Sequence, residues 1–106
     1  MSGTFETIKR LVAERQARLS EHALARLLKH NIKYREVLAG VPDAIVVEEY
    51  PNYAHGPAVL VLHPDRNGDP VHTLWGLPAS GEKLAFVITV YRPDERWTAD
   101  KLRRIK

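Results

Sequence analysis

Positions 88–97 read Ile-Thr-Val-Tyr-Arg-Pro-Asp-Glu-Arg-Trp, which is a short apolar strand followed by an abrupt stop. Side chains alternate between the two faces of a strand, so we expect Ile88 and Val90 to point to one face. Thr89 and Tyr91 then share the opposite face. The proline inside the stretch lacks the N–H that a continuing strand would need. The stretch therefore predicts the last strand of a sheet, with two hydroxyl groups side by side on one face.

Three segments upstream have the same β-branched and apolar character, and turn residues separate them. Asn67-Gly68 lies between the second and third of them and is typical of a hairpin loop. Together with residues 84–91, these segments predict a four-stranded antiparallel sheet in which each strand pairs with the next. The three upstream strands are expected at residues 44–50, 58–62 and 71–75.

The first 40 residues have helical spacing instead. Apolar residues recur three or four positions apart from Phe5 to Leu19, which predicts an amphipathic helix. Ser20 is a suitable N-cap for a second helix that ends at Asn31, and a third is expected at about residues 34–39. Thr98 is a candidate cap for a short C-terminal helical turn. The sequence thus predicts one α+β domain over residues 1–106, with N-terminal helices packed on a four-stranded antiparallel sheet.

The amino-acid composition excludes several kinds of functional site. The 106 residues include no cysteine, which excludes disulfides, thiolate nucleophiles and cysteine-based zinc or iron–sulfur centres. The HExxH motif and closely spaced histidine pairs are absent, so we expect neither a metal nor another cofactor. The longest apolar runs are far shorter than the roughly 20 residues of a membrane span, and we expect a cytoplasmic protein with no membrane association.

Charge is distributed unevenly along the chain. Formal net charge is +4 over residues 1–40, −4 over residues 41–91 and +3 over residues 92–106, giving +3 in total. Basic ends around an acidic middle would suit a polyanion such as RNA. A basic isoelectric point is also common in proteins that bind no nucleic acid, so charge alone leaves both alternatives open.

The second helix carries a polar stripe. His22, Arg26, Lys29 and Lys33 fall on one side, roughly opposite a core stripe expected from Leu24, Leu27 and Leu28. The simplest interpretation of such a stripe is a solvated face. His22, however, lies in the first helical turn, where free N–H groups attract anions, and a neutral histidine beside an arginine suits phosphate chemistry. His72 lies on a strand, where a histidine usually has a structural role.

An ordered set of short motifs resembles a known family. The set comprises Leu19-Ser20-Glu21-His22-Ala23 with Arg26, then Ile32, Val37, Glu49-Tyr50-Pro51, Pro57, Pro70-Val71-His72, and Ile88 to Pro93 with Trp97. These residues resemble DUF4258, a prokaryotic family of small domains of unknown function that is grouped with the RelE, ParE and BrnT type of toxins. The resemblance spans about residues 19–97.

The resemblance implies a RelE-like fold and a metal-independent ribonuclease of a toxin–antitoxin system. Cleavage by the 2′-hydroxyl needs a base, an acid and a cation on the phosphate. The residues implied are His22 and His72 as base and acid in either order, Arg26 as the phosphate clamp, Tyr91 or Thr89 as orienting hydroxyls, and Lys29, Lys33 and Arg92 as substrate contacts. The implied partners are RNA, free or on the ribosome, and a cognate antitoxin. The alternative is a non-catalytic module of the same fold that binds protein or nucleic acid.

Overall fold

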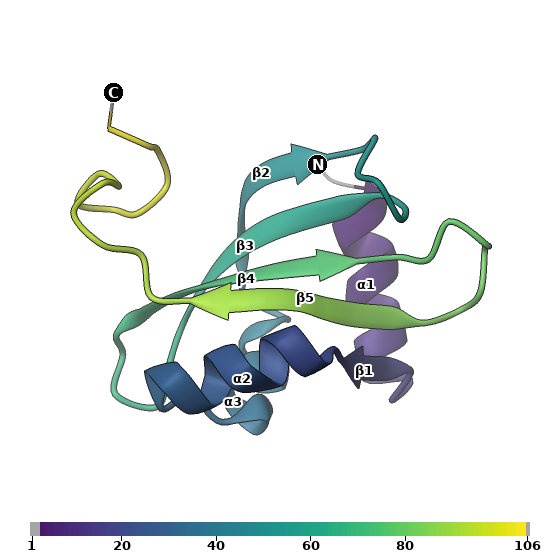
Figure 1. The fold of residues 1–106 in the computed structure, drawn as a ribbon, viewed down its shortest axis with the longest axis horizontal. Helices are drawn as coiled ribbons and strands as arrows, with labels where there is room; N and C mark the ends of the chain where they lie inside the picture. The colour runs from purple at the N-terminus through teal and green to yellow at the C-terminus, as the bar shows by residue number, and fades with distance from the viewer. Residues whose placement is uncertain (1–2, 106) are drawn as a thin grey trace.

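The computed structural model describes residues 3–105, and within this range three helices and five strands form one α+β unit (Figure 1). The strands make a single sheet in the order β1-β5-β4-β3-β2. None of the helices in this range is long and apolar enough to cross a membrane. The elements are α1 (Gly3–Ala13), β1 (Ala17–Leu19), α2 (Glu21–His30), α3 (Tyr34–Gly40), β2 (Ile45–Tyr50), β3 (Ala58–Pro64), β4 (Pro70–Gly76) and β5 (Ala85–Tyr91).

The sheet differs from the prediction at one edge. Strands β2 to β5 pair antiparallel in chain order, as predicted. The strand β1 was not predicted; it pairs parallel with β5, Leu19 opposite Val87, so the sheet is five-stranded and mixed. Helix α1 ends at Ala13, and Arg15 adopts a positive φ of 61° that turns the chain. Leu19 had been placed on the first helix because its spacing from Val12 is helical, and three residues are too few to show strand alternation.

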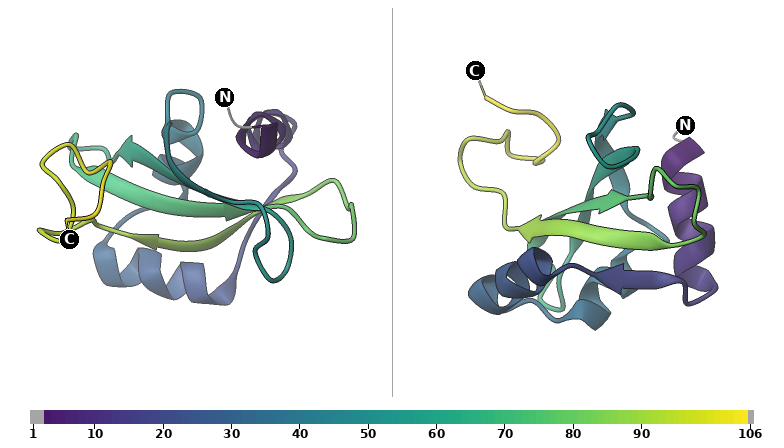
Figure 2. Two further views of the ribbon diagram at one scale, coloured as in Figure 1. Left: turned by 90° about the horizontal axis from the view of Figure 1, so that it is seen from above. Right: turned by 45° about the vertical axis from the view of Figure 1, so that its right-hand side comes forward.

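The helices cover the sheet from both sides. In the view from above, α1 and α3 lie on one side and α2 runs along β5 on the other (Figure 2). Fully buried side chains of the sheet, including Trp75, pack against Ile8 and Leu11 of α1 and Val37 of α3. Ala23 and Leu27 of α2 belong to the same buried cluster. Polar side chains of α2 and β5 also meet, since His22 lies against Thr89.

A β-bulge changes the alternation predicted for the last strand. Thr89 pairs with Leu74 and Val87 with Trp75, so Ile88 is an extra residue on β5. The fully buried residues of β5 are Ala85, Val87 and Val90, and Ile88 is only partly buried. The strict alternation predicted for residues 88–91 is therefore interrupted at Ile88. Tyr91 lies beyond the bulge and remains directly opposite His72.

Helix α2 is also rotated from its predicted orientation. Leu27 is buried as expected, but Leu24 is 48% exposed and Leu28 is 75% exposed. Ala23, fully buried, is the residue that joins Leu27 in the core. A small side chain lets the helix approach β5 closely, and the helix therefore rests on the face that carries Ala23 and Leu27.

The C-terminal segment is not helical within the described residues. Trp97 and Arg104 form an isolated antiparallel bridge, and the Ile105 N–H donates to the Arg96 carbonyl at 2.7 Å. The helical turn predicted from Thr98 is thus wrong; so short a helix needs strong packing to persist, and here the backbone groups pair across a loop instead. Trp97 is buried, and its ring packs edge-on against the His72 ring of β4.

A close contact at Gly40 gives a stability prediction. A Cβ atom there would lie 2.5 Å from Nδ1 of His63, a buried ring whose Nε2 is 2.7 Å from the Thr73 hydroxyl and cannot easily move. Alanine ordinarily stabilises a helix over glycine by about 1 kcal/mol, but overpacking costs about 1–3 kcal/mol. We expect Gly40→Ala to reduce the free energy of unfolding by about 1–2 kcal/mol in urea titrations. Gly3→Ala, where a Cβ meets nothing within 4 Å, is the control and should be neutral or stabilising.

Candidate functional site

A cleft of about 670 Å³ opens between α2, the end of β5 and the C-terminal segment 93–105. Its walls come from two parts of the chain that are far apart in sequence, α2 and residues 89–105. Basic side chains predominate among them, which suits an anionic ligand. The lining residues are Arg26, Lys29, His30, Thr89, Tyr91, Arg92, Asp94, Arg96, Trp97, Arg104 and Ile105.

Two cations of the cleft have no partner among the described residues of the protein. Arg26 and Lys29 are three residues apart on α2 and therefore neighbours on its surface. Within residues 3–105, neither makes a hydrogen bond or an ion pair, whereas each of the other arginines lining the cleft does. Uncompensated positive charge in a concave site favours binding of an anion, and these two residues are its best candidates for phosphate contacts.

The cleft's other arginines are held by the protein. Arg96 pairs with Asp94 at 2.8 Å, and Arg104 pairs with Glu48 at 3.0 Å while lying over the Trp97 ring. These pairs hold the C-terminal segment together and tie it to β2, so they build the wall of the cleft. Their net positive charge is largely cancelled.

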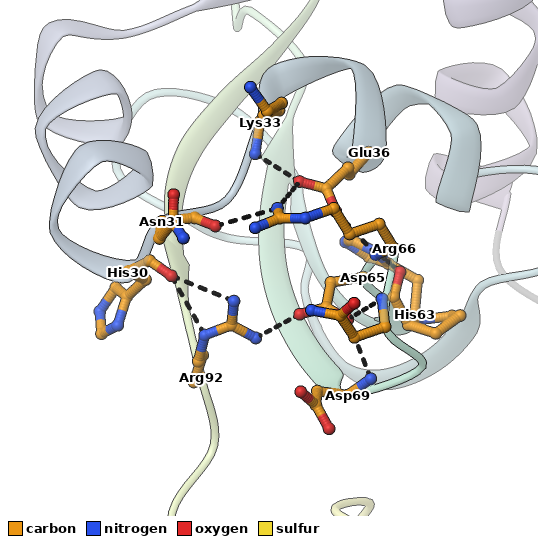
Figure 3. A network of polar contacts seen from close by, with 11 residues as sticks. His30, Asn31, Lys33, Glu36, His63, Asp65, Arg66, Asp69 and Arg92 are labelled. Atoms are coloured by element: carbon orange, nitrogen blue, oxygen red, sulfur yellow. Dashed lines mark hydrogen bonds and ion pairs between the residues drawn. The ribbon is translucent and has the colours of Figure 1, made fainter.

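Arg92, the residue after β5, is likewise held by contacts within the protein (Figure 3). Its guanidinium donates to Asp65 Oδ2 at 2.8 Å and, through two nitrogens, to the His30 carbonyl at the C-terminal end of α2. Although burial raises it, hydrogen bonds from Arg92 and from two backbone N–H groups hold the pKa of Asp65 below its ordinary value. Arg92, which was predicted to contact substrate, lines the cleft and has each of its three guanidinium nitrogens hydrogen-bonded within the fold.

Lys33 lies outside the lining of the cleft. Its backbone N–H donates to Glu36 Oε2 at 2.6 Å at the start of α3, and Arg66 donates to the same carboxylate (Figure 3). Hydrogen bonds from these backbone and side-chain groups lower the pKa of Glu36 despite its burial. The structure therefore brings Lys29 to the cleft but not Lys33.

His22 is placed against β5 by the cap of its helix. The Ser20 hydroxyl accepts from the Ala23 N–H at 3.0 Å and lies 3.2 Å from the Ile88 carbonyl, to which it donates. This double contact fixes the first turn of α2 beside β5. The exposed His22 ring then places Nε2 at 3.1 Å from the Thr89 hydroxyl, which lines the cleft.

His72 is placed against Tyr91 by strand register. The two residues are paired directly across β4 and β5, and Nδ1 of His72 is 3.1 Å from the Tyr91 hydroxyl. Nε2 is 2.8 Å from the Lys101 carbonyl, and the ring packs edge-on against Trp97. His72 is fully buried, with both nitrogens occupied, so it meets the cleft only through Tyr91.

Burial sets the protonation states of this pair. It lowers the pKa of His72, an effect that the Lys101 carbonyl partly offsets, and it raises the pKa of Tyr91 to about 12. At neutral pH the imidazole is therefore uncharged and the phenol keeps its proton.

The structure brings together most, but not all, of the predicted site. Thr89 and Tyr91 line one cleft with Arg26 and Lys29, and His22 and His72 are hydrogen-bonded to the two hydroxyls. Residues 93–105 were not predicted as a wall. The Lys101 contact is made by a backbone carbonyl, which leaves no sequence signal. In residues 3–105, no three His, Cys, Asp or Glu side chains are grouped so that they could hold a metal ion.

Two buried histidines predict acid sensitivity. Burial lowers the pKa of both His63 and His72 below 6.5. As pH falls through 6.5, the unfolded chain takes up protons that the folded protein does not. The free energy of unfolding is therefore highest above this pH and decreases below it. We expect a loss approaching about 1.4 kcal/mol per pH unit for each ring until its folded pKa is reached.

Thermal melting from about pH 8 to about pH 5 measures this effect. The matched control is His55→Gln, at an exposed position, which should keep the full pH dependence. A melting temperature that stays constant across this range would contradict burial of the two neutral rings.

Comparison with known proteins gives one result. The sequence profile of a family described as a domain of unknown function, DUF4258, matches residues 19–92. The match begins in β1 and ends at Arg92, so it includes His22, Arg26, His72, Thr89 and Tyr91, and leaves out α1 and the C-terminal wall. No curated protein and no solved structure matches the chain significantly. Since the profile covers more than half of the chain, the protein belongs to the DUF4258 family.

Proposed function

We propose that the protein is a metal-independent ribonuclease that binds single-stranded RNA in the basic cleft. The observation that carries this proposal is the pair of unpartnered cations, Arg26 and Lys29, beside His22 and two cleft-facing hydroxyls. Phosphate supplies the acceptors that these cations lack, and an imidazole at the edge of the same site supplies acid–base chemistry.

The roles follow from exposure and partners. His22 is exposed and takes the proton of the 2′-hydroxyl, which attacks phosphorus as the bond to the 5′-oxygen breaks. Arg26 holds the phosphate and neutralises the charge that develops on it. Lys29, one turn further along α2, stabilises the leaving 5′-oxygen, which takes its proton from solvent.

His72 acts in this scheme by holding Tyr91 rather than by reaching the phosphate. Its ring is fully buried, so a direct acid or base role would need a rearrangement of the C-terminal segment.

We further propose that the domain is a RelE-like toxin that acts in the cytoplasm, on free RNA or on the ribosome, and is neutralised by an antitoxin. Support comes from the resemblance of the matched region to the RelE, ParE and BrnT type of toxins. Induction of this gene alone should arrest growth, and co-expression of the adjacent gene should relieve the arrest. Normal growth after induction of well-folded protein would count against the toxin proposal.

One observation favours a second candidate, a non-catalytic module that binds nucleic acid. His72, the second histidine of the predicted acid–base pair, is buried with both nitrogens satisfied, so the cleft presents a single accessible imidazole of the pair. This candidate predicts salt-sensitive RNA binding with no cleaved product.

Incubation of purified protein with single-stranded RNA in EDTA separates the two. The ribonuclease yields shortened RNA, and the binding module yields only a shifted complex.

A further inference from the structure

The C-terminal segment fixes the tautomer of His72. Nε2 is 2.8 Å from the Lys101 carbonyl oxygen, and a carbonyl only accepts hydrogen bonds, so Nε2 carries the hydrogen. A neutral imidazole has a single N–H, and burial keeps the pKa of His72 low enough for the ring to be neutral at pH 7. Nδ1 is therefore a bare acceptor.

This tautomer determines where the Tyr91 proton points. The phenol oxygen is 3.1 Å from Nδ1, and two acceptors cannot bond to each other, so the Tyr91 hydroxyl donates to His72. Its pKa of about 12 means that the proton is retained at neutral pH. What remains on the oxygen are lone pairs, and Tyr91 lines the cleft. Tyr91 thus presents an acceptor, and no donor, to a ligand.

Acceptors are scarce among the cleft's side chains. Arg26 and Lys29 are donors, and the Asp94 carboxylate is engaged by Arg96 through three hydrogen bonds between 2.8 and 3.1 Å. A complementary ligand therefore needs anionic acceptors for the two cations and at least one donor for Tyr91. A phosphodiester backbone with deoxyribose has the acceptors but no sugar donor. RNA has both, because each ribose carries a 2′-hydroxyl.

We infer that Tyr91 distinguishes RNA from DNA by accepting a hydrogen bond from a ribose 2′-hydroxyl, and that His72 and the Lys101 carbonyl hold the Tyr91 proton away from the ligand. This inference rests on the proposed function for its ligand class. It adds the chemical group that is read and the side chain that reads it.

The test is a binding measurement in the His22→Ala background, where the proposed cleavage is suppressed. Three probes are compared: a single-stranded RNA, the DNA of the same sequence, and the same RNA with fluorine in place of every 2′-hydroxyl. Fluorine keeps the ribose-like sugar shape but cannot donate. We expect RNA to bind about 3- to 10-fold more tightly than either analogue, the range of one net hydrogen bond.

Two variants test whether the preference for RNA depends on the Tyr91 hydroxyl. Tyr91→Phe should bring RNA affinity down to that of DNA while leaving DNA affinity unchanged. Tyr53→Phe is the matched control, since it removes a phenol hydroxyl outside the cleft, and it should keep the preference.

If the His22→Ala protein, which keeps Tyr91, binds RNA and 2′-fluoro RNA with equal affinity, that result alone overturns the inference. So would an RNA preference that survives Tyr91→Phe. Cleavage products are measured separately, so a protein that cuts RNA but ignores Tyr91 refutes the inference alone. A protein that prefers RNA through Tyr91 but never cuts it refutes the ribonuclease alone.

Discussion

The His22→Ala variant is expected to cleave RNA about 10²- to 10⁴-fold more slowly than the unaltered protein, because it removes an exposed imidazole that is bonded to the cleft-lining Thr89 hydroxyl. RNA binding should change little, since His22 contributes chemistry rather than charge to the site. The measurement is single-turnover cleavage of a labelled RNA with protein in excess, alongside its dissociation constant.

The control for this variant is His55→Ala, which removes an exposed histidine from the loop between β2 and β3. It should cleave at the unaltered rate. Cleavage by His22→Ala within a few-fold of the unaltered rate would remove His22 from the site, even if the protein proves to be a ribonuclease.

Replacement of Arg26 by glutamine should slow cleavage by about 10²- to 10³-fold, the usual cost of one group that stabilises transition-state charge. Arg26 has no ion-pair partner within the described residues, and it is a half-buried residue of the cleft lining. Its loss should therefore leave folding intact. The rate at saturating protein should fall more than the affinity for RNA, which separates charge development in the reaction from uniform binding.

Lys29→Gln is the matched variant, one turn along the same helix. It should mainly weaken binding and reduce the slope of log affinity against log salt by about 0.7, the value for one phosphate contact on a single strand. Equal effects of the two substitutions on rate and on affinity would mean that neither cation acts specifically in the chemical step.

The sheet could be predicted from sequence wherever a pattern was long enough to repeat. Strands β2 to β5 have six or seven residues each, and turn residues separate them. Strand β1 has three residues, and its parallel pairing with β5 depends on a turn at Arg15 that only the backbone conformation shows. The bulge at Ile88 was likewise invisible, because an extra residue in one strand is defined by its partner strand.

The residues of the site were easier to predict than their environments. His22, Arg26, Thr89 and Tyr91 meet at one cleft and its edge because a helix stripe and a strand face have fixed periods. The burial of His72 could not be predicted, since it depends on residues 97–101 folding back over β4 through a loop with no regular pattern.

Arg92 gives the same lesson for charge. The family resemblance implied a substrate contact for it, and the ion pair with Asp65, 27 residues away, could not be read from the sequence.

The proposed mechanism requires that the cleft cleave RNA with its own side chains. The most direct measurement is the analysis of RNA ends after incubation with the purified protein in excess EDTA. We expect a 2′,3′-cyclic phosphate on one fragment and a 5′-hydroxyl on the other, because the 2′-oxygen is the nucleophile, and both ends should disappear with His22→Ala. Intact RNA under conditions where the protein binds it, or fragments with 5′-phosphate ends, would contradict the proposed mechanism.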